Sequence, residues 1–134
     1  MPDKHVLIVD DCSIDRMLLQ RAFGKVYGPA VALREAENAE TAIEAIEQDV
    51  FDAVLLDINM PGYDGFHVLR SARRRYPAVP PLIFMYSSSR HPDDVSRATE
   101  EGANDFICKP TGIAGIEAVV SRCGTRIDSA RTAG

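Results

Sequence analysis

The sequence has few features of disulfide-rich, zinc-binding or membrane-spanning proteins. Its 134 residues include three cysteines, an odd number without CxxC spacing, so we expect free thiols rather than a disulfide framework or a redox pair. Its three histidines are isolated from one another and from the cysteines, which argues against a zinc site. No apolar stretch approaches the ~20 residues that span a bilayer, and the N-terminus leaves no room for a signal peptide. We therefore expect a cytoplasmic protein that does not enter a membrane.

The sequence also lacks an excess of positive charge and the glycine-rich motifs of nucleotide-binding proteins. Fifteen Lys and Arg against 20 Asp and Glu give a net charge of −5, which argues against direct binding to nucleic acid. Neither GxGxxG nor GxxxxGK[ST] follows the first apolar run, so a dinucleotide or P-loop site is not expected. The basic run Arg73-Arg74-Arg75 is typical of a solvated helix end, where cations complement the carbonyl dipole.

Five short apolar runs alternate with helical patterns along the chain. This alternation predicts an α/β fold, a doubly wound parallel sheet with helices on both faces. At this length we expect one domain over residues 1–134, with the core at about 4–127 and a polar tail at 128–134.

Helix boundaries and buried faces also follow from the pattern. Ser13 is a good N-cap for the first helix, and Asn38 for the second. Helical spacing places Ile14, Met17, Leu18 and Ala22 on one face of the first helix. The inward side of the last helix is predicted to carry Ile113, Ile116, Val119, Val120, Cys123 and Ile127.

Polar residues stand where the apolar runs end. Asp57 follows the run Ala53–Leu56, and Pro61, Gly62 and Gly65 then turn the chain. The other runs end in Asp10-Asp11, in Ser87 and in Lys109. Because parallel strands end at the same edge of a sheet, where such folds bind ligands, we expect three carboxylates, a hydroxyl and an ammonium to meet there.

That combination has a specific chemistry. Clustered carboxylates repel one another, and a hard divalent cation with oxygen ligands, such as Mg²⁺, relieves the repulsion. A carboxylate such as Asp57 can attack phosphorus to give an acyl phosphate, and Lys109 can neutralise charge on the phosphoryl oxygens. Taken singly, Asp10 and Asp11 could instead be helix N-terminal acids, and Asp57 a loop-capping acid.

Five motifs occur in order at matching separations: Asp10-Asp11, the loop DINMPGYDG that begins at Asp57, Ser87, Phe106 and Lys109-Pro110. With these motifs the chain resembles the receiver domains of two-component response regulators, most closely the single-domain chemotaxis-type receivers. The resemblance extends roughly from His5 to Cys123. It implies a flavodoxin-like (βα)5 fold with the strand order 2-1-3-4-5.

The resemblance also implies a set of site residues. Asp11, Asp57 and the backbone carbonyl of Asn59 would bind Mg²⁺, for which Mn²⁺ can substitute, and Asp10 would act largely through water. Asp57 would accept a phosphoryl group from a phosphohistidine of a partner kinase or phosphotransfer protein. Lys109 and Ser87 would contact the phosphoryl oxygens, and a cis Lys109-Pro110 bond would aim the lysine.

Phosphorylation would then act as a switch. The hydroxyl of Ser87, with Ser88 beside it, would pull in the following loop, and Phe106 would turn inward. The surface of the fourth helix, fifth strand and fifth helix, including Arg90, Arg97 and an apolar contact from Phe106, would bind a downstream protein. The resemblance implies a phosphoacceptor regulator rather than an enzyme, either monomeric or weakly dimeric on phosphorylation.

Three alternatives stay open. The chain could be a phosphorelay intermediate, or a receiver fragment of a larger regulator. A different class is a magnesium-dependent phosphatase with an aspartyl nucleophile. Such enzymes use a second acid two residues after the nucleophile, where this chain has Asn59, and a cap domain, which it lacks.

Overall fold

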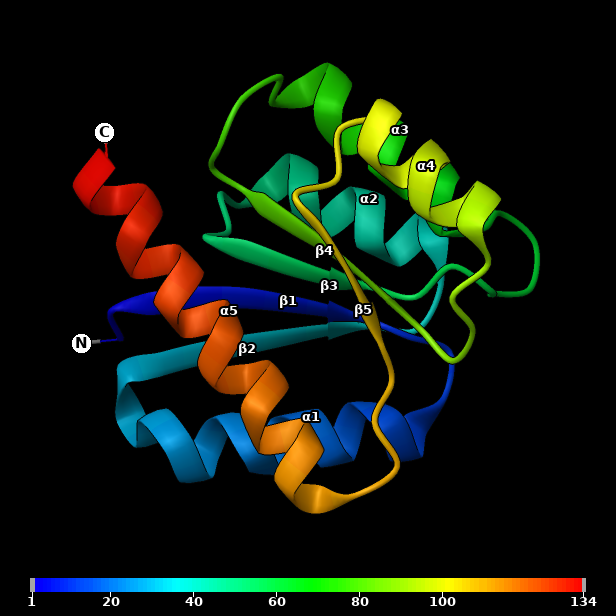
Figure 1. Cartoon of the computed structure of the whole chain (residues 1–134). Helices are drawn as coiled ribbons and strands as arrows, with labels where there is room; N and C mark the ends of the chain where they lie inside the picture. Colours follow the sequence, from blue (N-terminus) through cyan, green and yellow to red (C-terminus); the bar gives the residue numbers. More distant parts are fainter. Residues whose placement is uncertain (1, 134) are drawn as a thin grey trace.

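Residues 2–133, which the computed structural model describes, build one five-stranded parallel sheet in the order β2-β1-β3-β4-β5 (Figure 1). The strands are β1 (Lys4–Val9), β2 (Val31–Ala36), β3 (Ala53–Leu56), β4 (Leu82–Ser87) and β5 (Asp105–Cys108). All four neighbouring pairs run parallel. The predicted fold class and strand order are therefore confirmed.

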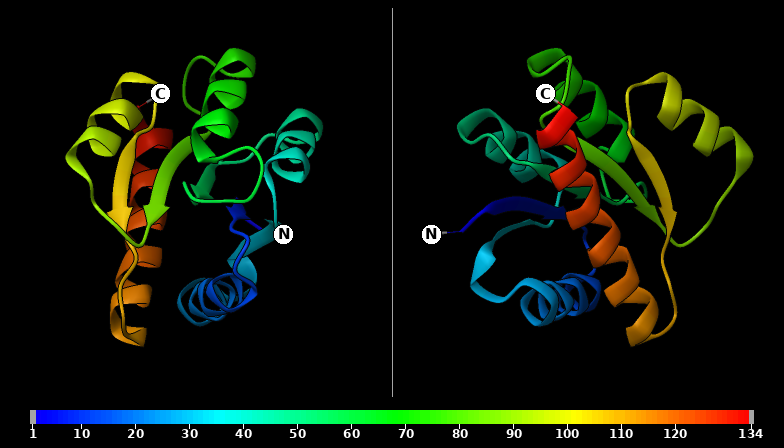
Figure 2. Two further views of the ribbon diagram at one scale, coloured as in Figure 1. Left: turned by 90° about the vertical axis from the view of Figure 1, so that its right-hand side faces the viewer. Right: turned by 60° about the vertical axis from the view of Figure 1, so that its left-hand side comes forward.

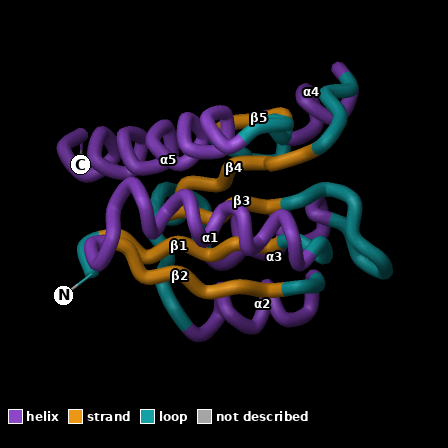
Figure 3. The backbone as a smooth tube through the Cα atoms, turned by 90° about the horizontal axis from the view of Figure 1, so that it is seen from below, coloured by secondary structure: helices purple, strands orange, loops and turns teal. Residues whose placement is uncertain are grey.

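Helices cover both faces of this sheet. They are α1 (Ser13–Tyr27), α2 (Ala39–Gln48), α3 (Gly65–Arg75), α4 (Pro92–Glu100) and α5 (Ile113–Ala133), and a 3₁₀ turn, η1 (Gly28–Ala30), follows α1. α1 and α5 lie on one face, and α2, α3 and α4 on the other (Figure 3). Within the described part of the chain, no helix is both long enough and apolar enough to cross a membrane.

The central strand β3 has no solvent-facing side. All four of its residues are buried, Val54 and Leu56 against α2 and α3, and Ala53 and Leu55 against α1 and α5. Successive side chains of a strand point to opposite faces, and here both faces are covered by helices, so an uninterrupted apolar run is stable in a strand. The rigid strand fixes the position of the residue that follows it, Asp57.

The helix caps match the sequence pattern in one helix and not in another. Asn38 caps α2 by accepting a hydrogen bond from the Thr41 N–H at 2.8 Å, as predicted. The prediction that Ser13 caps α1 is wrong, because Ser13 is already helical and Cys12 occupies the N-cap. The Cys12 N–H donates to Asp10 Oδ1 at 2.9 Å. This bond draws the chain into the helix one residue earlier than expected.

The predicted inward side of α5 is confirmed except at Ile113, since Ile116, Val119, Val120, Cys123 and Ile127 are buried. The predicted face of α1 is correct at Ala22 and wrong at Ile14 and Met17. Ile14 and Ile113 are 62% and 70% exposed, and Met17 is 38% exposed. α1 instead buries residues that include Leu19 and Phe23. Because α1 carries apolar residues on more than one side, helical spacing alone did not define which side faces the sheet.

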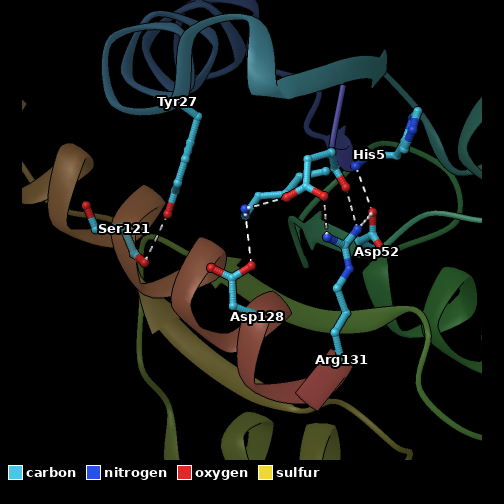
Figure 4. A network of polar contacts seen from close by, with 8 residues as sticks. His5, Tyr27, Asp52, Ser121, Asp128 and Arg131 are labelled. Atoms are coloured by element: carbon cyan, nitrogen blue, oxygen red, sulfur yellow. Dashed lines mark hydrogen bonds and ion pairs between the residues drawn. The ribbon is translucent and has the colours of Figure 1, made fainter. Parts of the chain in front are cut away.

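The last residues do not form a separate tail, because residues 128–133 continue α5. Arg131 Nη1 lies 2.9 Å from Asp3 Oδ1, and its Nη2 lies 3.0 Å from Asp52 Oδ2. These contacts, drawn in Figure 4, join the end of α5 to the start of β1 and to the residue before β3. The end of α5 and the start of β1 lie at the edge of the sheet opposite to the strands' carboxyl ends (Figure 1).

Candidate functional site

The carboxyl ends of β1, β3, β4 and β5 lie at one edge of the sheet, which faces the viewer in the left view of Figure 2. Asp57 follows β3 directly, and its N–H donates to the Val9 carbonyl at the end of β1 at 2.9 Å. Parallel pairing therefore brings Asp57 beside Asp10 although 46 residues separate them in the sequence. The convergence predicted from the strand ends is present.

Three carboxylates form the centre of this edge. One oxygen from each of Asp10, Asp11 and Asp57 lies within 4.8 Å of the other two. Asp10 and Asp57 are buried, and Asp11 is exposed. An all-oxygen donor set with an open side fits a hard cation such as Mg²⁺. Mutual repulsion of the carboxylates gives the folded chain an electrostatic reason to bind one.

The environment of Asp57 strongly disfavours its charged form when no cation is bound. Burial and, next, the Asp10 charge raise the pKa of Asp57 to about 7, against the lowering effects of Lys109 and the Asn59 N–H. A nucleophilic carboxylate must be ionised. A cation at the cluster, or a rise in pH, therefore increases the ionised fraction of Asp57.

Lys109 supplies the positive charge of the site. Its Nζ lies 2.8 Å from Asp10 Oδ2, 2.8 Å from Asp15 Oδ2 and 3.8 Å from Asp57 Oδ2. Burial lowers the pKa of Lys109, but hydrogen bonds to Asp10 and Asp15 outweigh burial and leave that pKa above its usual value. The ammonium is therefore charged at neutral pH, next to the carboxylate on which a phosphoryl group would be placed.

Asp15, one of the carboxylates that contact Lys109, was not predicted from the sequence. It lies in the first turn of α1, four residues after Asp11. The signal was available, because a helix that starts at Ser13 places its first turn at the same edge of the sheet. Tyr86 was also missed: its ring centroid lies 5.6 Å from Lys109 Nζ.

The predicted cis bond between Lys109 and Pro110 is wrong. In the described residues, cis X-Pro bonds occur at Val79-Pro80 and Pro80-Pro81, and Lys109-Pro110 is trans. The trans form is the ordinary state of such bonds. With this bond trans, Lys109 Nζ donates to Asp10 Oδ2 at 2.8 Å.

Ser87 lies at the end of β4, beside the end of β5. It is 1% exposed, and its Oγ accepts a hydrogen bond from the Ser89 N–H at 3.3 Å. The Lys109 N–H donates to the Ser87 carbonyl at 2.7 Å, which links the two strand ends. Ser88 and Asn59 are exposed. The roles given to these residues by the resemblance stay predictions.

The predicted partner surface lacks the exposed apolar contact that was expected from Phe106. Phe106 is buried, in the cluster that contains Met85 and Ala98, so its ring offers no exposed apolar contact. Arg90 covers it: the guanidinium lies 6.0 Å from the ring centroid and donates to the Phe106 carbonyl at 3.2 Å. Arg97 is exposed and pairs with Glu101 at 2.6 Å. This surface is therefore polar and basic at Arg90 and Arg97.

The prediction of a solvated basic run is wrong at Arg73. The Arg73 guanidinium donates to the Gly102 carbonyl at 2.8 Å and to Asn104 Oδ1 at 2.7 Å. Asn104 Oδ1 also accepts the Ile83 N–H at 2.8 Å. The Arg73 side chain is thus a structural link from α3 to the α4–β5 loop and to β4. Arg74 and Arg75 are exposed, as predicted.

Comparison with known proteins identifies the family of this chain. The family described as "Response regulator receiver domain" matches residues 6–121. The DNA-binding transcriptional regulator NtrC of Escherichia coli (strain K12) is 34% identical over 117 residues, which cover 87% of this chain and 24% of that protein. Protein-glutamate methylesterase/protein-glutamine glutaminase 6 of Anaeromyxobacter dehalogenans is 37% identical over 124 residues, 90% of this chain and 34% of that protein. The chain thus spans about a quarter to a third of these relatives.

Solved structures agree with the fold. A CheY-like receiver domain protein from Methanospirillum hungatei JF-1 superposes with a TM-score of 0.85 at 21% identity and covers 98% of each chain. The receiver domain of the putative response regulator NarL from Mycobacterium tuberculosis has a TM-score of 0.76 at 30% identity, covering 93% of this chain and 98% of the other. The family match spans nearly the whole sheet and all three carboxylates. The chain therefore belongs to the response regulator receiver domain family, the phosphoacceptor modules of two-component signalling.

Proposed function

We propose that Asp57 is the phosphoacceptor of this receiver domain and takes its phosphoryl group from a phosphohistidine of a histidine kinase or phosphotransfer protein. The observation that carries the proposal is the arrangement around Asp57. Its carboxylate follows a rigid central strand, belongs to a cluster of three carboxylates, and lies 3.8 Å from the Lys109 ammonium. Nucleophile, candidate cation ligands and a compensating positive charge are thus assembled in one place.

The proposed reaction is a phosphoryl transfer from nitrogen to oxygen. An ionised Asp57 oxygen attacks phosphorus, and an O–P bond forms while the N–P bond breaks. The electron pair of that bond returns to the donor imidazole, which takes up a proton from water if its other ring nitrogen is not already protonated. Later hydrolysis by water releases inorganic phosphate and regenerates the carboxylate.

The residues present fit a magnesium ion. Asp11, Asp57 and the Asn59 carbonyl would hold it, with Asp10 acting through water. When bound, Mg²⁺ offsets the charge of the carboxylates and of the phosphoryl oxygens. Its binding would also favour the ionised form of Asp57, whose pKa is otherwise raised by burial to about 7.

Lys109 and Ser87 would respond to the new phosphoryl group. Lys109 donates to one phosphoryl oxygen, and the buried hydroxyl of Ser87 turns from the Ser89 N–H toward another. A shift of the β4–α4 loop follows, and through Arg90 and Phe106 it changes the surface of α4, β5 and α5. Phosphorylation thereby shifts the population between two states of that surface, and we propose that a downstream protein binds one of them.

Exposed apolar side chains border the same edge of the sheet. Ile14 and Met17 lie in the N-terminal part of α1, which follows the acidic pair, and Ile113 is the first residue of α5, after Lys109. Apolar side chains around a polar reaction centre favour the approach of a protein partner. This supports a protein-bound phosphoryl donor rather than a small-molecule substrate.

The relatives support a second role for the same switch. Because NtrC and the methylesterase are several times longer than this chain, residues 1–134 could be the single receiver domain of a larger regulator rather than a free messenger or a phosphorelay intermediate. In each case we propose a phosphoacceptor regulator rather than an enzyme, monomeric or weakly dimeric on phosphorylation. Asn59, where an aspartyl phosphatase needs an acid, supports this over phosphatase activity.

Intact-mass spectrometry with acetyl phosphate and Mg²⁺ tests the proposal. We expect a labile gain of one phosphoryl group in the wild-type protein and in the control Asp94→Asn, which removes a partly exposed acid in the first turn of α4. Asp57→Asn should show no gain. An unchanged gain in Asp57→Asn, or none in the wild type, would contradict the assignment.

A further inference from the structure

The Lys109 ammonium is not shared equally among its three carboxylate neighbours. It lies 2.8 Å from both Asp10 and Asp15, and a full ångström further, at 3.8 Å, from Asp57. Asp15 is outside the cluster of three carboxylates that could hold a cation. Its side chain, about one-third exposed, reaches Lys109 from the first turn of α1.

We propose that Asp15 is a positioning residue that restrains Lys109 on the α1 side of the site and thereby slows phosphorylation of Asp57. The inference rests on the proposed function and adds to it a residue that sets the rate. An ammonium has three N–H donors, and the contacts with Asp10 and Asp15 occupy two of them. The third donor is free for a phosphoryl oxygen, but Nζ lies 3.8 Å from Asp57, and its movement toward Asp57 lengthens the contact with Asp15 on the α1 side.

Asp15 differs from Asp10 in what its contact can contribute to the reaction. Asp10 is buried within the cation-binding cluster, so its charge also acts on Asp57 and on a bound cation. The only side-chain hydrogen bond of Asp15 in the described residues is to Lys109. A contact that is stronger in the ground state than in the transition state raises the barrier, and Asp15 has that property.

The size of the effect follows from the exposure of the pair. Lys109 is mostly buried, but the Asp15 carboxylate is partly open to water, so the contact is weaker than a fully buried ion pair. We expect removal of the Asp15 charge to increase the maximal rate of phosphorylation about two- to fivefold.

Initial rates with acetyl phosphate at saturating Mg²⁺ test the inference. Asp15→Asn should raise the maximal rate about two- to fivefold, and Asp15→Glu, which keeps a carboxylate, should give a lower rate than Asp15→Asn. The control Glu40→Gln removes an equivalent charge from the first turn of α2 and should leave the rate unchanged. An unchanged or lower rate in Asp15→Asn overturns the inference.

A Lys109→Gln background separates restraint of the lysine from simple removal of negative charge. If Asp15 acts through Lys109, Asp15→Asn has no accelerating effect in that background. An acceleration that persists there would be a general electrostatic effect and overturns the inference.

A denaturation cycle over the same two substitutions, without any phosphoryl donor, should show non-additive changes in the free energy of unfolding. Additive changes would mean that the contact is not formed in solution, which also overturns the inference.

Wild type and Asp57→Asn are included as references in the phosphorylation assay. If no phosphorylation requires Asp57, the proposed function is overturned, and this inference with it. Phosphorylation of Asp57 that Asp15→Asn leaves unchanged overturns this inference alone.

Discussion

Gly65 lies against Asp57 so closely that a β-carbon at position 65 would collide with the Asp57 carbonyl oxygen. It would also come within 2.9 Å of the Ile58 Cα, and the Gly65 N–H donates to the Ile58 carbonyl at 2.9 Å. The neighbouring atoms belong to the backbone, which cannot move aside as a flexible side chain can. The loop from Asp57 to α3 therefore closes only with glycine at this position, and Gly65 fixes the direction of the candidate phosphoacceptor.

Replacing Gly65 with alanine should destabilise the domain and disturb the site. We expect Gly65→Ala to lower the free energy of unfolding by about 1–3 kcal/mol, measured by urea denaturation, and to weaken Mg²⁺ binding. The matched control is Gly24→Ala in α1, where a β-carbon meets nothing within 4 Å. That variant should gain about 0.5–1 kcal/mol from helix propensity. Equal stabilities of the two variants would contradict the proposed close approach.

The stability of the cation-free domain should fall as the pH rises toward neutrality. Asp57 has a pKa of about 7 in the folded chain against 3.8 as its ordinary value. Between these values the native state holds a proton that the unfolded state has lost, so its contribution to stability decreases with rising pH. One pKa unit corresponds to about 1.4 kcal/mol, which makes the change a few kcal/mol in size.

Urea denaturation in the presence of a chelator, from about pH 5 to pH 8, measures this dependence. Asp57→Asn removes the titrating group, so its stability should change less with pH than that of the wild type and should exceed it at the upper end. Parallel pH profiles for the two proteins would show that Asp57 is ionised in both states.

Magnesium should stabilise the folded domain in a manner that depends on pH. The cation competes with a proton for Asp57, so its affinity should fall as the pH decreases below about 7. Thermal unfolding with added MgCl₂, and with MnCl₂ in parallel, measures the stabilisation. Asp11→Asn should reduce it strongly, whereas Asp94→Asn should not. Equal stabilisation of both variants would place the cation elsewhere.

Arg73 should be the one residue of the basic run whose loss is costly. Arg73→Ala removes hydrogen bonds from a charged donor to Gly102 and Asn104, and such bonds contribute about 1.5–3 kcal/mol each in favourable cases. We expect a loss of about 2–3 kcal/mol in the free energy of unfolding. Arg74→Ala, an exposed neighbour, should change it by less than about 0.5 kcal/mol. Similar losses in both variants would support a general charge effect instead.

Coupling from Ser87 to Phe106 can be followed by fluorescence, because the chain contains no tryptophan. In a Phe106→Trp reporter, phosphorylation should change the emission, since the buried ring lies beneath Arg90. Adding Ser87→Ala should reduce that change while the extent of phosphorylation by mass remains high. An undiminished change in the double variant would exclude Ser87 as the link.

Much of the candidate site follows from local sequence, because parallel strands end at one edge of the sheet. Asp10, Asp57, Ser87 and Lys109 each stand at the end of a different apolar run, and parallel pairing of the strands is enough to bring them together. The cap at Asn38 was predictable for a similar reason, since it depends on a hydrogen bond to a residue three positions away. The buried side of α1 was not, because several of its sides are apolar and the sheet selects one.

The sequence by itself determined the order of the elements, the composition of the acidic edge and the residue that can act as nucleophile. Only the tertiary structure decided how those residues share their charges. Lys109 lies closer to Asp10 and Asp15 than to Asp57. Arg73 becomes a structural link, Phe106 is buried, and Lys109-Pro110 is trans. The physical reason is the separation of the interacting residues along the chain: strand and cap patterns involve residues only a few positions apart. Ion pairs and burial depend on atoms that folding brings together from distant parts of the chain.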